Sequence, residues 1–149
     1  MSVLGTKATV SREYTRKLIH DFANGADVTL VGSPRLAALA EAELRGEPLA
    51  DADVAAELSP CFVDERGRRT DTVVLACTHF PLLLERIERL APWPVRFIDP
   101  APAIARRVVD LIGPANPGGA AAAASIVFTS RRPPTPALRV ALARLGIEP

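Results

Sequence analysis

The sequence contains little cysteine, histidine, lysine or aromatic residue. Two of its 149 residues are cysteine, two are histidine, and aromatic residues make up 5%. Two cysteines are too few to staple a domain of this size, and no C-x-x-C or H-x-x-x-H spacing indicates zinc. Only Lys7 and Lys17 are lysines, and no glycine-rich loop precedes a predicted helix. We therefore expect no metal, no pyridoxal or dinucleotide cofactor and no P-loop.

The sequence also lacks a charge bias and a long apolar run. Eighteen Lys plus Arg stand against 17 Asp plus Glu, which leaves a formal charge of +1. This balance does not favour a nucleic-acid or membrane-surface partner. No apolar run approaches the roughly 20 residues that cross a bilayer, and no signal segment is evident at the N-terminus. We expect a cytoplasmic protein.

The residues that are present predict an α/β domain. Hydrophobic residues make up 48% and charged residues 23%, as in ordinary globular proteins. Short β-branched runs alternate with amphipathic helical stretches, a pattern typical of a mostly parallel sheet between helices. We expect strands at 2–5, 27–31, 72–76, 95–98 and 126–129, a loop at 6–10, an exposed turn at 64–69 and a linker at 113–124. Helices are expected after the candidate N-cap Ser11, after Ser33-Pro34, over 50–58, after Pro81, after Asp99-Pro100 and after Pro133-Pro134.

One position stands out for its chemistry. Cys77 follows the best buried strand of the sequence and precedes a turn into a helix. Ligands of open α/β sheets bind outside the carboxyl ends of the strands, and the first turn of a helix stabilises a thiolate. His79 is placed to act as a charge partner or proton donor, and Thr78 offers a hydroxyl group. The alternative is that Cys77 is a small buried hydrophobic residue.

The residues around Cys77 carry a family resemblance. Ala76-Cys77-Thr78-His79-Phe80-Pro81-Leu82-Leu83 resembles the second catalytic-cysteine motif of bacterial glutamate racemases. The family usually has Gly and Tyr where this sequence has Ala76 and Phe80. The stretches 3–10, 98–107 and 127–130 are similar to other segments of the family, in the same order. The resemblance covers most of the chain, and the Cys-Thr-His-Phe-Pro block is its most specific part.

The resemblance implies a cofactor-independent racemase that interconverts L- and D-glutamate and supplies D-glutamate for peptidoglycan. In this family two cysteines face each other across the α-carbon of the substrate. Cys77 corresponds to the second of these acid/base groups and His79 to its helper. Thr78, with Thr6 and Thr9, corresponds to residues that hold the carboxylate and ammonium groups of glutamate. For Thr6 and Thr9, ordinary capping of a loop is the alternative.

Two departures from the family pattern matter. The family's first catalytic cysteine motif is absent, and Cys61, which follows Ser59-Pro60 and precedes the strand-like Phe62-Val63, is expected to be structural. The chain thus resembles a C-terminal half. Residues 1–97 correspond to the second racemase domain, and residues 98–149 to a partial second unit that would complete the first domain. We expect such a chain to be inactive alone and to associate with a missing N-terminal half or with a second copy.

The second departure concerns an assisting glutamate that many members carry after the strand predicted at 27–31. The aligned position is Gly32, and Glu41 and Glu43 are candidates to replace the lost acid. Other readings stay open for the function as a whole. Aspartate and hydantoin racemases and related decarboxylases are relatives, although the Thr-His-Phe-Pro sequence favours the glutamate branch. A non-catalytic remnant or binding module is an alternative of a different class.

Overall fold

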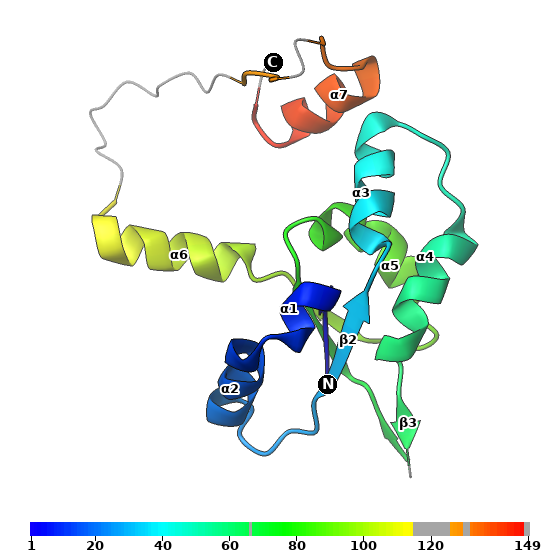
Figure 1. Cartoon of the computed structure of the whole chain (residues 1–149), viewed down its shortest axis with the longest axis vertical. Coiled ribbons are helices and arrows are strands. Elements are labelled where there is room, and N and C mark those ends of the chain that lie inside the picture. Colours follow the sequence, from blue (N-terminus) through cyan, green and yellow to red (C-terminus); the bar gives the residue numbers. More distant parts are fainter. Residues whose placement is uncertain (66, 115–125, 130–131, 148–149) are drawn as a thin grey trace.

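A computed structural model describes residues 1–65, 67–114, 126–129 and 132–147. Its centre is a four-stranded parallel sheet in the order β2-β1-β5-β6 (Figure 1). The strands are β1 (Ser2–Thr6), β2 (Thr29–Ser33), β5 (Thr72–Ala76) and β6 (Arg96–Ile98). A short antiparallel hairpin, β3 (Asp64–Glu65) and β4 (Arg68–Arg69), stands apart from this sheet. The α/β fold class predicted from the alternating pattern is confirmed.

Three helices cover one face of the sheet and enclose the core. They are α3 (Leu36–Arg45), α4 (Asp51–Leu58) and α5 (Leu84–Leu90), which lie together on one side of the strands in Figure 1. Short 3-10 helices, η1 (Ser59–Cys61) and η2 (Phe80–Leu83), lead into and out of this layer. Among the described residues, the fully or nearly fully buried apolar ones are Leu4, Val31, Leu36, Ala40, Val54, Leu58, Cys61, Val73, Leu75, Phe80, Leu83 and Ile87.

The other face of the sheet is only partly covered. The five-residue helix α1 (Lys7–Ser11) and the helix α2 (Glu13–Phe22) lie on this side, and neither has a fully buried residue (Figure 1). Between α2 and the strands lies an apolar hollow of about 590 Å³, whose lining includes Val3, Val74 and Ala76. Tyr14 and Phe22 are 67% and 72% exposed. The sheet therefore has one closed and one open face.

Two further helices follow the sheet. The helix α6 (Ala101–Ile112) leads away from the strands in Figure 1 and has no buried residue, although its apolar side chains form a stripe. The helix α7 (Pro136–Arg144) packs against α3. Gly46, in the left-handed conformation with φ 73°, ends α3, and a Cβ built there would lie 2.6 Å from the Cβ of Ala137. No helix in the described ranges is long and apolar enough to span a membrane.

The prediction of a loop at 6–10 is wrong, because most of this segment belongs to α1. The Thr6 side chain accepts a hydrogen bond from the Thr9 backbone amide at 3.1 Å and so caps this helix. Ser11, the expected N-cap of the following helix, is the last residue of α1. The position before α2 is Arg12, which makes no side-chain cap.

Other local predictions need correction. Residues 126–129 form no strand, because no described strand pairs with them. The strand-like pair Phe62-Val63 is irregular. The exposed turn predicted at 64–69 is confirmed at its described positions, which are all exposed, with Gly67 at φ 78° between the short strands β3 and β4. The second strand begins at Thr29 rather than at residue 27. Most of the linker predicted at 113–124 lies outside the described residues, and only its first two positions are within them.

Candidate active site

Cys77 lies immediately beyond the carboxyl end of β5, as its sequence context predicts. Its side chain is partly buried and packs against the core cluster. The buried Phe80 anchors the loop that follows, and its amide donates to the Cys77 carbonyl oxygen at 3.2 Å. The Leu82 amide donates to the carbonyl oxygen of His79 at 3.1 Å. These turns hold Cys77 and His79 close together at the edge of the sheet.

His79 connects the Cys77 thiol to a carboxylate. The Sγ atom of Cys77 lies 3.9 Å from Nδ1 of His79, and Nε2 of His79 lies 2.9 Å from Oε1 of Glu41. The Thr78 hydroxyl lies 3.5 Å from the same Nδ1. A carboxylate only accepts hydrogen bonds, so the Glu41 contact places a proton on Nε2. In the neutral imidazole Nδ1 is then an acceptor that faces the thiol.

The structure distinguishes between the two candidate glutamates. Glu41 reaches His79, whereas Glu43 pairs with Arg86 of α5 at 3.1 Å. Residues two apart on a helix face in different directions, so α3 presents only one of them to the histidine. Gly32 has no room for an acid, because a Cβ there would lie 2.8 Å from Cγ2 of Val10. The acid beside His79 therefore comes from the middle of α3 rather than from the end of β2.

Thr6 and Thr9 form a hydroxyl pair at the same edge. Their Oγ1 atoms are 2.9 Å apart, and Thr6 Oγ1 also accepts from the Thr9 amide. Gly5 pairs with Ala76, so the next residues, Thr6 and Cys77, leave the sheet side by side. The pair uses one of its two hydroxyl protons internally, and the other remains to donate to a ligand. Capping and ligand binding are thus compatible roles.

Cys61 lies apart from this edge and has a different environment. It is fully buried, and burial raises the pKa of its thiol from 9.0 to about 12. The Cys61 carbonyl oxygen accepts a hydrogen bond from the buried hydroxyl of Ser2 at 2.7 Å. A neutral, enclosed thiol acts as a small apolar side chain.

One expectation about Cys77 needs adjustment. The sequence predicts that the first turn of a following helix stabilises the thiolate. The structure places the 3-10 helix η2 there, and α5 begins only at Leu84. Four residues of 3-10 helix carry little of the aligned dipole of an α-helix. The described contact of the Cys77 thiol at this edge is therefore with His79, which in turn contacts Glu41.

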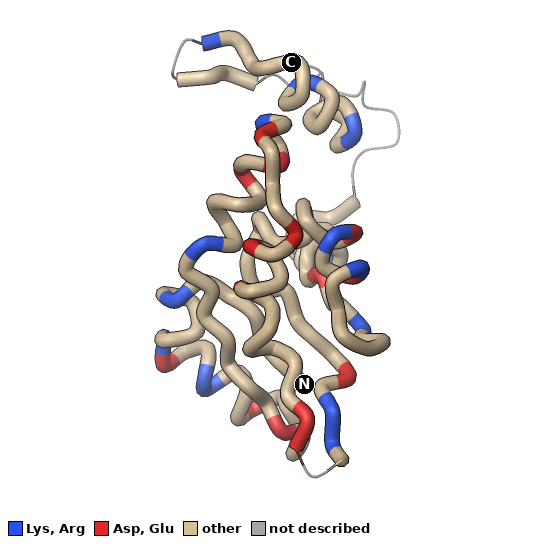
Figure 2. The backbone as a smooth tube through the Cα atoms, turned by 90° about the vertical axis from the view of Figure 1, so that its right-hand side faces the viewer, with Lys and Arg blue, Asp and Glu red and all other residues tan. Residues whose placement is uncertain are grey.

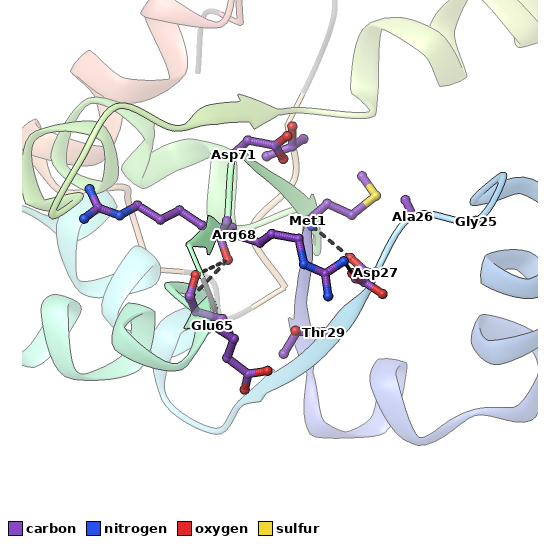
Figure 3. A pocket seen from close by; sticks show the side chains of 12 residues that line it. Met1, Gly25, Ala26, Asp27, Thr29, Glu65, Arg68 and Asp71 are labelled. Carbon is purple, nitrogen blue, oxygen red and sulfur yellow. Dashed lines mark hydrogen bonds and ion pairs between the residues drawn. The ribbon is translucent and has the colours of Figure 1, made fainter.

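The opposite edge of the sheet has a polar hollow of about 910 Å³, lined by residues at the amino ends of β1, β2 and β5 (Figure 3). Arg68 points toward Asp27 across it, with Nη1 2.6 Å from Oδ2. Acidic and basic residues are interspersed along the described backbone (Figure 2). No three His, Cys, Asp or Glu side chains in the described ranges cluster as metal ligands.

Comparisons with known proteins agree on one family. The family described as Asp/Glu/Hydantoin racemase matches residues 1–108. The glutamate racemase of Agrobacterium fabrum is 56% identical over 112 residues, which are 75% of this chain and 41% of that protein. The glutamate racemase of Rhizobium meliloti is 57% identical over the same length, and the match covers 40% of that protein. The chain therefore spans about 40% of the length of these curated relatives.

A solved structure extends the likeness. The crystal structure of Escherichia coli glutamate racemase in complex with L-glutamate and the activator UDP-MurNAc-ala matches with a TM-score of 0.79 and 38% sequence identity. The match covers 99% of this chain and 55% of that chain. The fold and the sequence lead to the same conclusion: the chain belongs to the Asp/Glu/hydantoin racemase family.

Proposed function

We propose that this chain provides one half of a glutamate racemase site, with Cys77 as one of two opposed acid/base groups. The observation that carries the proposal is the line of contacts from the Cys77 thiol through His79 to Glu41. The names of the relatives support glutamate as the substrate, as does the L-glutamate in the related crystal structure. The product D-glutamate would serve peptidoglycan synthesis.

The contacts support proton transfer by the thiol. Nδ1 of His79 takes the proton of Cys77, and the resulting imidazolium is stabilised by the Glu41 carboxylate at 2.9 Å. The Cys77 thiolate then removes the α-proton of bound glutamate and becomes a thiol again. A second acid on the opposite face of the α-carbon donates a proton to the carbanionic centre, which inverts it. In the reverse direction the two groups exchange roles.

The threonine pair and Thr78 would hold the substrate. The spare hydroxyl proton of the Thr6–Thr9 pair donates to a carboxylate oxygen, and the exposed Thr78 hydroxyl offers a further polar contact. Hydrogen bonds to a carboxylate are stronger than those between neutral groups. These hydroxyl groups would orient the α-carbon toward the Cys77 thiol.

We propose further that the second acid/base group comes from a different polypeptide segment. Cys61, the other cysteine of the chain, is buried in the core with a neutral thiol and does not reach this edge. The relatives contain more than half of their length outside the match. In this proposal residues 1–97 form one racemase domain, residues 98–149 belong to the other, and that other domain covers the exposed stripe of α6.

A chimeric enzyme tests the proposal. The 112 matched residues of the Agrobacterium fabrum racemase are replaced by their counterparts from this chain, which the 56% identity makes feasible. The chimera should racemise both enantiomers of glutamate, as followed by circular dichroism. Cys77→Ala in the chimera should lower kcat in both directions by at least about 10²–10⁴-fold, the usual cost of losing a positioned acid/base group.

Cys61→Ala is the matched control, and it should retain most of the activity because this thiol is structural. The 149-residue chain alone should show no racemisation, since a single thiol cannot return a proton to the opposite face. A folded but inactive chimera, or preference of the chimera for aspartate, would contradict the proposal. Ordinary enzymatic turnover by the 149-residue chain alone would contradict it equally.

A further inference from the structure

A row of small residues crosses the open face of the sheet just before its carboxyl edge. Gly5 of β1 pairs with Gly32 of β2 on one side and with Ala76 of β5 on the other. Residues directly opposite each other in adjacent strands share a face. Gly5 and Gly32 both lie under α1, which contacts β1 and β2.

The two glycines provide room rather than conformational freedom. Neither has a positive φ, unlike the other described glycines of the chain. A Cβ on Gly32 would lie 2.8 Å from Cγ2 of Val10 and 3.1 Å from the backbone Cα of Lys7. A Cβ on Gly5 would lie 3.3 Å from Cβ and Cγ2 of Thr9. Helix α1 therefore packs so closely on the two strands that a side chain at either glycine would press against it.

The position of α1 determines the position of the threonine pair. Thr6 is the last residue of β1 and the cap of α1, and Thr9 lies one turn along it. The Thr9 side chain packs against Gly5, and the Thr15 hydroxyl donates a hydrogen bond to the Thr9 carbonyl oxygen at 2.7 Å. A lift of α1 by a few tenths of an ångström would thus move Thr9 relative to both Thr6 and Cys77.

We infer that Gly5 and Gly32 are positioning residues for the substrate, which act by seating the Thr6–Thr9 hydroxyl pair beside Cys77. The inference rests on the proposed function for its ligand, glutamate. The requirement for glycine is stricter at position 32, because its closest neighbours include the backbone Cα of Lys7, which cannot rotate away. Gly5 has the looser one, because it faces side-chain atoms at 3.3 Å.

The first test uses the 149-residue chain and needs no activity. Hydrogen exchange measured by NMR reports on the Thr9 amide, which donates to Thr6 Oγ1 at 3.1 Å. Gly32→Ala should accelerate exchange at Thr9 by about tenfold or more and leave the β5 amides protected. The double variant Gly32→Ala/Val10→Ala removes the 2.8 Å contact and should recover part of the protection.

Gly25→Ala is the control for simple destabilisation. Gly25 has φ 78°, so alanine there is strained, but its Cβ would meet nothing within 4 Å. This residue lines the hollow at the opposite edge of the sheet. Gly25→Ala should lower the melting temperature and leave the Thr9 amide as protected as in the unchanged chain.

The second test uses the chimeric enzyme. Gly32→Ala should raise KM for glutamate and lower kcat/KM by about 10- to 100-fold, because small misplacements of positioning groups are costly. Gly5→Ala should do the same to a smaller extent, and Val10→Ala should partly rescue Gly32→Ala. Gly25→Ala should change neither constant.

Unchanged Thr9 exchange in both glycine variants would overturn the inference. A loss of stability with unchanged KM would also overturn it, since the glycines would then serve the fold alone. If Gly32→Ala does not fold, the Thr9 amide exchange and the KM of Gly5→Ala test the inference. A chimera that is inactive with all its glycines intact counts against the proposed function, and the exchange experiment then decides the seating of α1 by itself.

Discussion

The two cysteines of this chain have the same side chain and opposite environments. Cys61 is enclosed by core residues, and burial raises the pKa of its thiol to about 12. Cys77 is partly exposed, with an imidazole nitrogen 3.9 Å from its sulfur. Reactivity of a cysteine depends on the thiolate and on access to it. The difference between the two residues is therefore measurable without any substrate.

At the residue scale we predict selective alkylation of Cys77. A brief treatment of the folded chain with iodoacetamide at pH 8, followed by mass-spectrometric mapping, should label Cys77 more than about a hundredfold faster than Cys61. A pKa of about 12 leaves roughly one Cys61 thiol in ten thousand ionised at this pH. In denaturant both cysteines should label at similar rates. Equal labelling in the folded chain, or faster labelling of Cys61, would refute Cys77 as an active-site thiol.

At the element scale, an arginine of α5 holds the three helices of the closed face together. Arg86 donates to Glu43 of α3 at 3.1 Å, to the Leu49 carbonyl oxygen at 3.4 Å and to Asp51 of α4. Arg89 adds a second contact to Asp51 at 2.9 Å. These ion pairs thus join α3, which carries Glu41, to α5, which follows the Cys77 loop.

The cluster predicts an acid-dependent contribution to stability. Arg89 and Arg86 hold the pKa of the Asp51 carboxyl below its ordinary value of 3.8. A lowered folded-state pKa stabilises the fold above pH 3.8, and the contribution is lost as the pH falls through the folded-state value. Asp51→Asn should therefore lower the melting temperature at pH 7 by a few degrees or less, with a difference that shrinks below pH 3.8.

The measurement is thermal unfolding by circular dichroism across this pH range. Asp53→Asn is a suitable control, because Asp53 is exposed to a similar extent and pairs with Arg35 rather than with an arginine of α5. A difference for Asp51→Asn that stays constant down to pH 2 would contradict the ion-pair explanation.

The local sequence pattern was sufficient to predict the strands of the parallel sheet, because each of them is a short run rich in apolar residues. It was insufficient for α1, since Lys7–Ser11 has no helical periodicity and is fixed by the Thr6 cap and its seat on two glycines. Residues 126–129 have the composition of a strand. A strand also needs a partner, and the described part of the chain provides none.

The arrangement of the candidate site was predictable where its residues are adjacent in sequence. Cys77, Thr78 and His79 lie in one motif at a strand end, so sequence alone placed them together. Glu41 lies 38 residues from His79, and its contact depends on the orientation of α3. One signal was available: Leu36 and Ala40 mark the buried face of that helix, so Glu41 and Glu43 must point in different directions. Which of the two glutamates contacts His79 depends on the tertiary packing of α3.

At the scale of the whole molecule, apolar surface is left open beside α2 and along α6. The hollow beside α2 has a volume of about 590 Å³, and in the stripe of α6 Ile104 and Leu111 are 59% and 66% exposed. Exposed apolar patches of this kind mark interaction surfaces. In the proposed function the rest of a racemase covers the stripe of α6.

We predict that the isolated chain self-associates through these surfaces. Sedimentation velocity should show a concentration-dependent shift to larger species, with binding of a hydrophobic dye. Ile104→Glu together with Leu111→Glu should reduce both signals, whereas exposed polar substitutions such as Arg106→Glu and Arg107→Glu should not. A monomer with low dye binding at all concentrations would contradict this prediction.

The strand order also has a consequence for how the polypeptide acquires its fold. The first strand of the sequence occupies an interior position, between β2 and β5. Its pairing with β5 joins Ser2 to Val73 and closes a loop of some 70 residues before the core can form. Pairings so distant along the chain slow the search for the native state. On the ribosome, β1 therefore has no neighbour on one side until residues 72–76 have been synthesised, and these residues lead directly to Cys77.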